Sequence, residues 1–461
     1  KPPKEEYHMT KFQKQMLTIA AAGALTAVTA LPAMAFENEF HGLYNFNAIF
    51  SNNLKSTAGG VAGVGQDMNY MEQRVRLQYI AKASDDLKLV THFEINNRYG
   101  AKDNNQKIPS SSATTQTGVD TLGSDLDTDG VNIMTKHAYL DFNATKEINV
   151  KLGLQAWKDS IGGIFIDADV PGVLAVAKSG SFTAALGYTR YNDLAENTFT
   201  SSTEYVKRGD ITTDLSLLDL AYSLNKDTAV GVAYYLLRDE AGAATSATTS
   251  YTGYKTTLNT IAAYGKTKIG GVAVNGFVAK QMGEVKNTGA AAYDLKGYAA
   301  NLQAVAKVAT GTAKVGFLYV SGDSESGADN SAWQNVGVST FNDGGSMLIV
   351  RNNNHASTST NSWVKGTSVS NVQYAYAGYQ APITDKLGVV ANVGLGWDAQ
   401  TSYRGGDFIG TEVNGEVNYK LYPTLTLVAQ AGYLFLGDNA TYGISTQKDP
   451  YSYRLGARFS F

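Results

Sequence analysis

The connections between apolar segments alternate in length along the whole chain, and this alternation constrains the fold more than any other feature. Eight short turns lie at residues 84–86, 144–147, 178–181, 225–227, 266–270, 308–311, 382–385 and 421–424. Nine long, polar connections lie at about 51–67, 99–130, 158–171, 193–213, 239–255, 282–292, 322–370, 399–407 and 437–449. The pattern predicts about 18 strands, or 16 if short segments such as 172–178 are not strands. Both chain termini are then expected on the side of the short turns.

The segments themselves have the two-residue period of β-strands. In residues 72–82 one face carries Val75, Leu77, Tyr79 and Ala81, and the other carries Glu72, Arg74, Arg76, Gln78 and Lys82. Residues 87–98 repeat the arrangement, and no convincing helical stripe follows residue 36. Alternation alone fits a soluble sandwich as well as a barrel, so the lengths of the connections decide between them.

Tight turns on one side and long loops on the other are typical of a bacterial outer-membrane barrel. Hydrocarbon offers no hydrogen-bond partner, so a sheet in the membrane has to close on itself. Each strand needs only about 9–11 residues to cross and only one apolar face, which explains a mean hydropathy of −0.19 in a membrane protein. The sequence therefore predicts an all-β, transmembrane, antiparallel up-and-down β-barrel, wide enough at this strand number to hold water.

The N-terminal region has the pattern of a signal peptide. Met9 is followed by a basic stretch, an apolar Ala-rich stretch and the small-residue pattern Ala33-Met34-Ala35. We expect cleavage between Ala35 and Phe36. The domain prediction is thus a non-native or misassigned extension at 1–8, a signal peptide at 9–35 and a barrel domain at 36–461.

The sequence YSYRLGARFSF at residues 451–461 resembles the last strand of Gram-negative outer-membrane porins, in which hydrophobic or aromatic residues alternate up to a final Phe. Weaker similarity lies at 137–142, 153–155, 319–323 and 410–412. The resemblance implies that Tyr453, Leu455, Phe459 and Phe461 form the signal read by the barrel assembly machinery. It also implies that this strand pairs with the first strand near residues 40–50, and that the protein is a homotrimer among outer-membrane lipid and lipopolysaccharide.

Charged residues on the predicted inward faces are candidates for the pore lining. They are Glu72, Arg74, Arg76, Lys88, His92, Glu94, Arg98, Lys136, His137, Lys151, Arg454 and Arg458. The turn at 84–86 predicts that Glu72 lies near Arg98 and Glu94 near Arg76, so part of the guanidinium charge is internally paired.

In porins of the general type, a third loop folds into the lumen and places acidic residues opposite a basic arc. The matching loop here is 158–171, with Asp159, Asp167 and Asp169. One interpretation is a constriction with a transverse field that discriminates solutes by charge and dipole. The other is that these charges line a wet lumen and neutralise one another.

A second candidate constriction is the connection at 322–370, which is far longer than a turn requires. It carries the apolar run 347–350 inside a segment rich in Gly, Asn and Ser. An apolar run of this kind is rarely left bare in water. We expect it to enter the barrel mouth or to pack against a neighbouring protomer.

Metal binding has two weak candidates. Asp125, Asp127 and Asp129 begin like a calcium loop, but the twelfth position is Lys136 where a bidentate Glu is needed. A surface calcium site and a solvated acidic loop both remain open. His92 and His137 are predicted to face inward at similar height, which fits a weak metal or protonation site as well as ordinary lumen lining. We predict no metal and no cofactor.

The chain offers little catalytic material. It has no Cys, and it lacks both a Gly-x-Ser-x-Gly elbow and a Walker-type phosphate loop. A formal net charge of −3 does not favour nucleic acid as a partner. We expect no enzymatic activity.

The predicted function is a water-filled outer-membrane channel for passive diffusion of ions and small hydrophilic solutes. Two alternatives remain open. One is a substrate-selective channel that prefers anions, because Arg and Lys cluster between residues 74 and 151. The other is a barrel that serves as a scaffold for a partner protein.

Overall fold

The computed structural model describes residues 37–52, 68–99, 133–193, 212–242, 254–287, 290–323, 329–336, 341, 349, 369–400, 406–438 and 449–461. The strands are β1 (Glu37–Ser51), β2 (Met68–Ser84), β3 (Leu87–Arg98), β4 (Met134–Asn143), β5 (Ile148–Lys158), β6 (Asp167–Ser179), β7 (Phe182–Asp193), β8 (Thr212–Ser223), β9 (Ala229–Gly242), β10 (Tyr254–Ile269), β11 (Val272–Asn287), β12 (Ala290–Leu295), β13 (Tyr298–Val308), β14 (Gly311–Val320), β15 (Val372–Pro382), β16 (Leu387–Trp397), β17 (Phe408–Tyr422), β18 (Leu425–Leu436) and β19 (Tyr451–Ser460). Within these described ranges, no helix is long and apolar enough to cross a membrane.

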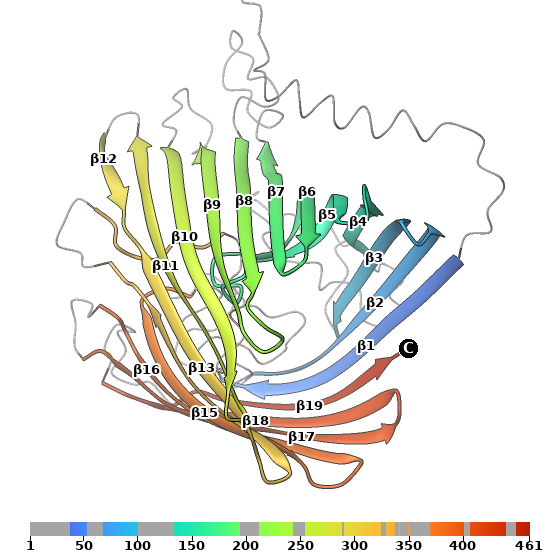
Figure 1. The fold of residues 1–461 in the computed structure, drawn as a ribbon. Helices are drawn as coiled ribbons and strands as arrows, with labels where there is room; N and C mark the ends of the chain where they lie inside the picture. Colours follow the sequence, from blue (N-terminus) through green and yellow to red (C-terminus); the bar gives the residue numbers. More distant parts are fainter. Residues whose placement is uncertain are drawn as a thin grey trace, which may run out of the picture.

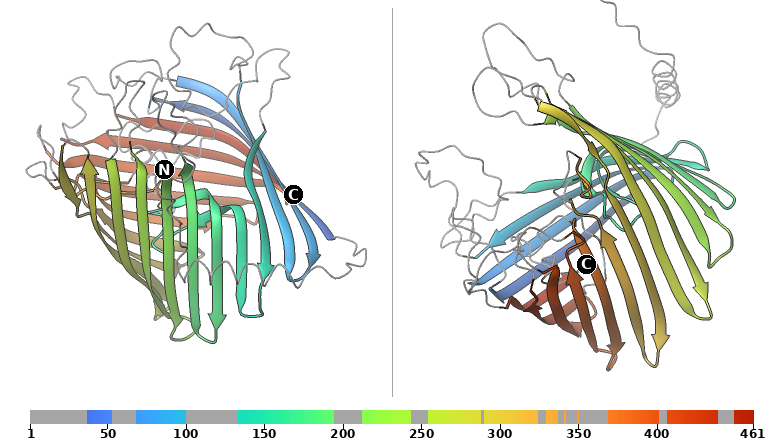
Figure 2. Two further views of the ribbon diagram at one scale, coloured as in Figure 1. Left: turned by 90° about the horizontal axis from the view of Figure 1, so that it is seen from above. Right: turned by 90° about the vertical axis from the view of Figure 1, so that its left-hand side faces the viewer.

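The strands form one closed antiparallel barrel (Figures 1 and 2). Consecutive strands pair with each other, and β1 closes the ring by pairing with β19 over Leu43–Ser51 and Ser452–Ser460. The short strand β12 pairs with the outer end of β11, whereas β13 pairs with the rest of β11. The barrel therefore has 18 spanning strands with β12 as an addition. This confirms the predicted fold class and strand number.

Two predicted connections differ from the structure. The connection at 282–292 is wrong as a loop, because β11 continues to Asn287 and β12 begins at Ala290. The third loop is shorter than predicted and comprises residues 159–166, since β6 begins at Asp167. Asp167 and Asp169 are therefore strand residues.

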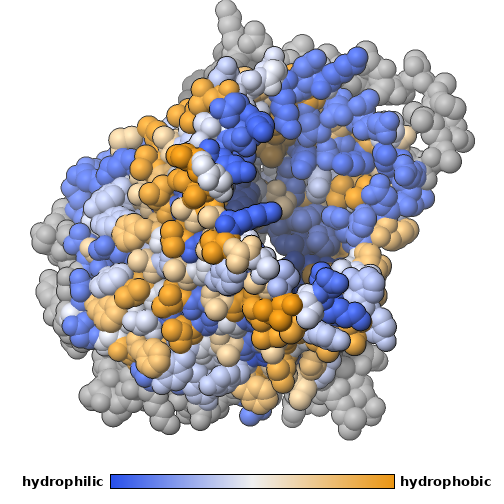
Figure 3. Space-filling model, turned by 60° about the horizontal axis from the view of Figure 1, so that its bottom comes forward, coloured by the Kyte–Doolittle hydropathy of each residue, from blue (hydrophilic) through white to orange (hydrophobic). Residues whose placement is uncertain are grey.

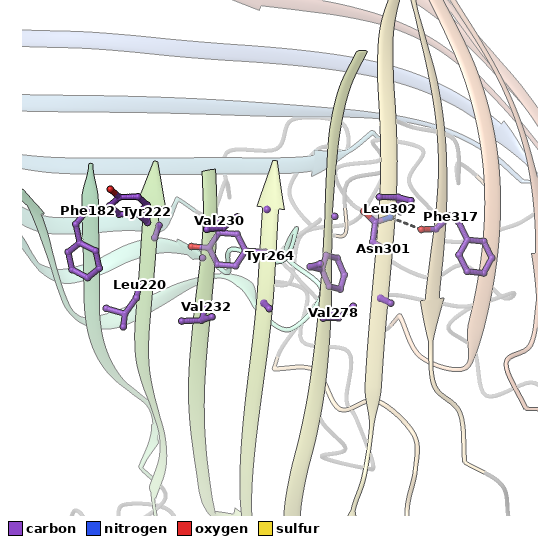
Figure 4. Close-up of a pocket in the computed structure, with 17 residues that line it drawn as sticks. Phe182, Leu220, Tyr222, Val230, Val232, Tyr264, Val278, Asn301, Leu302 and Phe317 are labelled. Atoms are coloured by element: carbon purple, nitrogen blue, oxygen red, sulfur yellow. Dashed lines mark hydrogen bonds between the residues drawn. The ribbon is translucent and has the colours of Figure 1, made fainter. Parts of the chain in front are cut away.

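The outer face of the barrel is apolar, as the alternation predicts. On β19 the outward side chains include Tyr453, Leu455 and Phe459, which are exposed, whereas the alternate residues Ser452 and Arg454 are buried. An apolar groove of about 830 Å³ crosses the outer face from β7 to β14 (Figure 4). Its lining includes Tyr222, Val232, Val278, Leu302 and Phe317. Such a surface suits lipid hydrocarbon on the outside.

The buried apolar core lies inside the barrel, where loops fold against the inner wall. Its largest fully buried side chains include Trp333, Tyr235, Phe165, Ile161 and Ile164. These side chains come from the 159–166 loop, from strand β9 and from the connection between β14 and β15. The lumen is therefore partly filled by loops and not only lined by strands.

The two ends of the closed sheet meet at Gly42 and Phe461. Each backbone N–H donates to the other residue's carbonyl oxygen, at 2.9 and 3.1 Å. A Cβ atom at position 42 would lie 2.1 Å from the Phe461 ring, so only glycine leaves room for that ring. The predicted pairing of the last strand with the first is confirmed.

Candidate functional site

One side of the lumen wall carries most of the predicted pore-lining charges. They come from β19 and from β2 to β5, which lie on one side of the barrel with β1 between β19 and β2. Seen in space-filling form, the molecule has a hollow surrounded by hydrophilic residues (Figure 3). The period-two alternation places these side chains inward because the residues beside them face lipid.

Glu94 is the centre of the ion pairs on β2 and β3. It forms salt bridges with Arg76 and with Arg74, the latter at 3.5 Å. Arg74 also donates to the side-chain oxygen of Asn96 at 2.7 Å. The register pairs Arg76 with Glu94 and Glu72 with Arg98, as predicted from the turn at 84–86. Both predicted pairings are confirmed.

Buried polar residues continue this network across the closure of the barrel. Glu72 is fully buried and accepts a hydrogen bond of 3.0 Å from Asn47 of β1. On the other side of β1, Glu416 pairs with Arg454 at 3.0 Å and with Arg458 at 3.5 Å. Arg454 also donates to Asn47 at 3.4 Å, so hydrogen bonds connect β17, β19, β1 and β2 across the closure.

In three of these pairs the cation is more exposed to the lumen than its carboxylate. The exposed fractions are 43% and 11% for Lys88 and Asp141, 35% and 15% for Arg458 and Glu416, and 27% and 12% for Arg76 and Glu94. Two further cations lie against aromatic rings, with Arg98 4.5 Å from the ring centre of Tyr70 and Lys151 5.6 Å from that of Tyr139. Two other pairs have the opposite order, with 23% and 31% for Lys136 and Asp169 and 2% and 15% for Arg454 and Glu416. The cation is therefore the more exposed partner at three positions of the wall and not along all of it.

A β-bulge on β4 brings Lys136 and His137 to the same carboxylate. His92 pairs with His137 and Phe93 with Thr135, so Lys136 is the extra residue. Lys136 forms a salt bridge with Asp169 of β6, and Nε2 of His137 lies 2.8 Å from the other carboxylate oxygen. Strict alternation would turn two neighbouring residues to opposite faces of the sheet. The bulge therefore allows Lys136 and His137, both predicted to line the pore, to face inward together.

The three predicted acidic loop residues have three different surroundings. Asp167 pairs with Lys158 at 2.7 Å, and Asp169 contacts Lys136 and His137. Asp159 is buried, and its carboxylate accepts hydrogen bonds from the backbone N–H groups of Ile161, Gly163, Phe165 and Ile166 at 2.6 to 2.9 Å. Burial raises the pKa of the Asp159 carboxyl, while the four N–H donors act in the opposite direction. Asp159 therefore shapes its own loop and does not present its charge to the lumen.

The connection between β14 and β15 packs on the 159–166 loop inside the barrel. The Trp333 indole N–H donates to the Ile164 carbonyl oxygen at 3.2 Å, and the Val336 N–H donates to the Phe165 carbonyl oxygen at 2.7 Å. Further along, Ile349 is fully buried, and its N–H donates to Glu412 of β17 at 3.1 Å. The expectation that this connection enters the barrel is confirmed for these described residues.

Gln281 of β11 anchors the connection to the wall. Its fully buried amide donates to Thr260 at 3.2 Å and to the Gln334 carbonyl oxygen at 2.6 Å, and it accepts from the Gln334 N–H at 2.8 Å. Sequence reasoning missed Gln281 and Trp333. The available signal was that two of the four Trp of the chain, Trp333 and Trp363, lie in one polar connection.

Several predicted residues lie outside the described residues. They are the cleavage position Ala35 and Phe36 and the calcium candidates Asp125, Asp127 and Asp129. Within the described ranges, no group of three or more His, Cys, Asp or Glu side chains is arranged to hold a metal ion.

Known structures share this architecture, although the sequence matches no family model and no curated protein. The outer membrane protein OpdK of Pseudomonas aeruginosa aligns with a TM-score of 0.54 at 10% identity, over 93% of this chain and 100% of that chain. OccAB4 of Acinetobacter baumannii aligns with a TM-score of 0.52 at 13% identity, over 94% and 100%. The chain has the fold of these outer-membrane barrels. A structure of OpdK with vanillate aligns with this outer-membrane-type barrel at a TM-score of 0.54 and 12% identity, over 92% and 98%.

Proposed function

We propose that this barrel lies in the outer membrane of a Gram-negative cell and forms a water-filled channel for passive diffusion of ions and small hydrophilic solutes. The observation that carries the proposal is a lumen wall of fixed charges around a hydrophilic hollow (Figure 3). A polar wall of this kind replaces part of the hydration of a passing solute, whereas an apolar one would not. The likeness to OpdK and OccAB4 supports a channel by analogy of fold.

The exposure of the cations favours a channel that prefers anions. Lys88, Arg458 and Arg76 lie closer to the lumen water than the carboxylates that neutralise them. A solute therefore meets positive potential first, even though the wall is nearly neutral as a whole. We infer a preference for small anions, carboxylates included, over cations of the same size.

The inserted loops would narrow the channel on the side opposite this wall. Trp333, Gln334 and the 159–166 loop pack against strands β9 to β11, whereas the charged pairs lie on the wall from β17 to β6. In this proposal Asp167 and Asp169 lie at the edge of the narrowed region, next to their cationic partners. The constriction is thus formed jointly by the two loops.

Conductance in planar bilayers tests the proposal. The purified barrel, measured in a salt gradient, should give single-channel steps whose current is proportional to voltage. The sign of its reversal potential should be the one that anion preference produces. Vanillate is a suitable organic anion for a blocking titration, because OpdK was solved with it. An absence of conductance would support the scaffold alternative, and a reversal potential for cations would contradict the anion preference.

The proposal includes partners that follow from an outer-membrane location. These are lipid and lipopolysaccharide around the barrel, the barrel assembly machinery during insertion, and two further copies in a homotrimer. The terminal residues Tyr453, Leu455, Phe459 and Phe461 are proposed as the assembly signal, and their exposed outward position on β19 supports this role. We expect no enzymatic activity.

A further inference from the structure

His92 of β3 and His137 of β4 face each other on the lumen wall. They are register partners, and their Nδ1 atoms lie 3.2 Å apart. Their ring centres are 5.0 Å apart. Two N–H groups cannot point at each other at this distance, so the two nitrogens share either one proton or one cation.

Asp169 determines which nitrogen of His137 carries the proton. Nε2 of His137 lies 2.8 Å from Oδ1 of Asp169, and an ionised carboxylate can only accept, so this nitrogen donates. In the neutral ring, Nδ1 then presents its lone pair toward His92. A carboxylate on the far nitrogen is the usual partner of a metal-binding histidine, because it fixes the tautomer and the ring orientation.

Each of the two cations nearest the histidine pair contacts a carboxylate. Arg76 and Lys136 are the nearby cations, and they are paired with Glu94 and Asp169. Gln78 lies opposite His92 in the register, and the Tyr139 ring stands edge-on to His137 at 6.2 Å. A divalent cation entering between the histidines would therefore face cations that are already held by carboxylates, with Glu94 shared between Arg76 and Arg74.

The separation of the two nitrogens also fits a metal ion. Zinc binds imidazole nitrogen at about 2.0–2.1 Å, and two nitrogens at that distance and 3.2 Å apart subtend roughly 100° at the ion, close to a tetrahedral angle. We propose that His92 and His137 bind a divalent transition-metal ion such as Zn²⁺ through their Nδ1 atoms, with Asp169 orienting His137.

The remaining coordination positions would be filled by water from the lumen. No set of three His, Cys, Asp or Glu ligands exists among the described residues. With two protein ligands the ion is exchangeable, and it adds positive charge to the lumen wall between β3 and β4. The site is independent of the proposed channel function, since binding can be measured without conductance.

Titration of the full chain, folded in detergent, with Zn²⁺ alone tests the site. Calorimetry should give saturable binding that is lost in His92→Gln and in His137→Gln. Asp169→Asn should weaken the affinity by about 10- to 100-fold, because it removes the orienting carboxylate and keeps both ligands. Heat-modifiable gel migration verifies that each variant is folded.

Three controls address other zinc-binding histidines. His41→Gln changes an exposed histidine of β1 whose ring lies 3.4 Å from Glu39, and it should leave the isotherm unchanged. His8→Gln and His355→Gln change the two histidines that lie outside the described residues, and they should also have no effect. Zinc binding that persists in the His92→Gln and His137→Gln variants, or no binding by the unmodified chain, would overturn the proposal.

A spectroscopic readout on the unmodified chain avoids any dependence on how variants fold. Cu²⁺ alone, at one equivalent, should give an electron paramagnetic resonance spectrum with hyperfine splitting from two equivalent imidazole nitrogens. A spectrum that lacks nitrogen splitting would exclude the pair as ligands. The expected spectrum should revert to that of free Cu²⁺ in the double variant of His92 and His137.

Discussion

The indole N–H of Trp333 donates a hydrogen bond of 3.2 Å to the carbonyl oxygen of Ile164, and this bond joins two loops that are 169 residues apart in sequence. The Trp333 ring also packs edge-on against Phe165, with ring centres 6.3 Å apart. Both loops are inside the barrel, so their contact determines how much of the lumen they occupy. The relationship gives the first prediction.

Replacement of Trp333 by Ala should enlarge the open cross-section. Truncation of a buried Trp costs about 3–5 kcal/mol, and this cost falls on the packing between the loops because the strands of the barrel pair independently. We expect a higher single-channel conductance with an unchanged migration of the folded barrel on unheated gels. Phe317→Ala, on the lipid face of β14, is the matched control. Equal conductance in Trp333→Ala and the unmodified protein would mean that the loops do not limit the current.

Removal of the Glu94 charge should increase the anion preference. Glu94 pairs with Arg74 and Arg76, so Glu94→Gln removes the carboxylate that both guanidinium groups contact and makes the lumen wall more positive. Arg76→Gln should shift the reversal potential in the opposite direction. Both shifts should shrink at about 1 M salt, where the screening length falls to about 3 Å. Shifts of the same sign in the two variants would contradict the proposed role of this pair.

Substitution of Gly42 should weaken the closure of the barrel. A Cβ atom there would overlap the Phe461 ring at 2.1 Å, which is within the range where the neighbour has to move. The Phe461 ring is exposed and can move, so we expect Gly42→Ala to destabilise the barrel by about 1 kcal/mol, at the low end of the cost of overpacking. The measurement is the temperature at which the folded band disappears on a gel. Gly388→Ala, where the nearest neighbouring atom would be 3.9 Å away, should behave like the unmodified protein.

Acid should loosen the connection that carries Trp333. Asp329 accepts from the Lys296 ammonium and from the Asp294 N–H, and Lys296 lowers the pKa of the Asp329 carboxyl below its ordinary value. The pKa of an Asp carboxyl is about 3.9 in the unfolded chain, and it is lower here in the folded protein. The ionised carboxylate therefore stabilises the folded state at pH values above about 3.9. This stabilisation is lost as the pH falls through the lower pKa of the folded protein.

Current recordings below about pH 4 are the measurement for this pair. Open-channel noise should rise in the unmodified protein as Asp329 becomes protonated. Asp329→Asn lacks the titrating group, so its noise should already be raised at neutral pH and change little with acid. Because both side chains are exposed, the effect should be small and weaker in high salt. If the open-channel noise of the unmodified protein does not change with pH, Asp329 does not stabilise the position of the connection between β14 and β15.

The wall of the barrel was predictable from the sequence because its rules are local. The turn at 84–86 fixes the register of β2 against β3, and the two-residue period then places Arg76 opposite Glu94. The two-residue period also gave the outward position of Leu455, whereas the closure of β19 on β1 was implied by the resemblance of the last strand to that of porins. In each case one short turn or one repeated pattern determines the contact.

The interior was less predictable because its contacts join distant segments. Gln281 reads as an ordinary inward polar residue, and only the fold brings it to Gln334. Asp159 resembled a lumen-facing acid, but four backbone donors in a turn with glycines at positive φ capture its carboxylate. The bulge at Lys136 carries no signal in a two-residue period, since a single extra residue only interrupts it.

The attachment of the inserted loops to several strands also has a mechanical consequence. The 159–166 loop is continuous with β5 and β6, its Ser160 N–H donates to Tyr235 of β9, and Trp333 and Gln334 tie it through Gln281 to β11. Together these segments act as a transverse brace between strands that are far apart around the ring. Under lateral pressure from the bilayer, the cross-section cannot flatten without breaking these bonds, so the barrel keeps its shape by internal bracing as well as by the pairing of its strands.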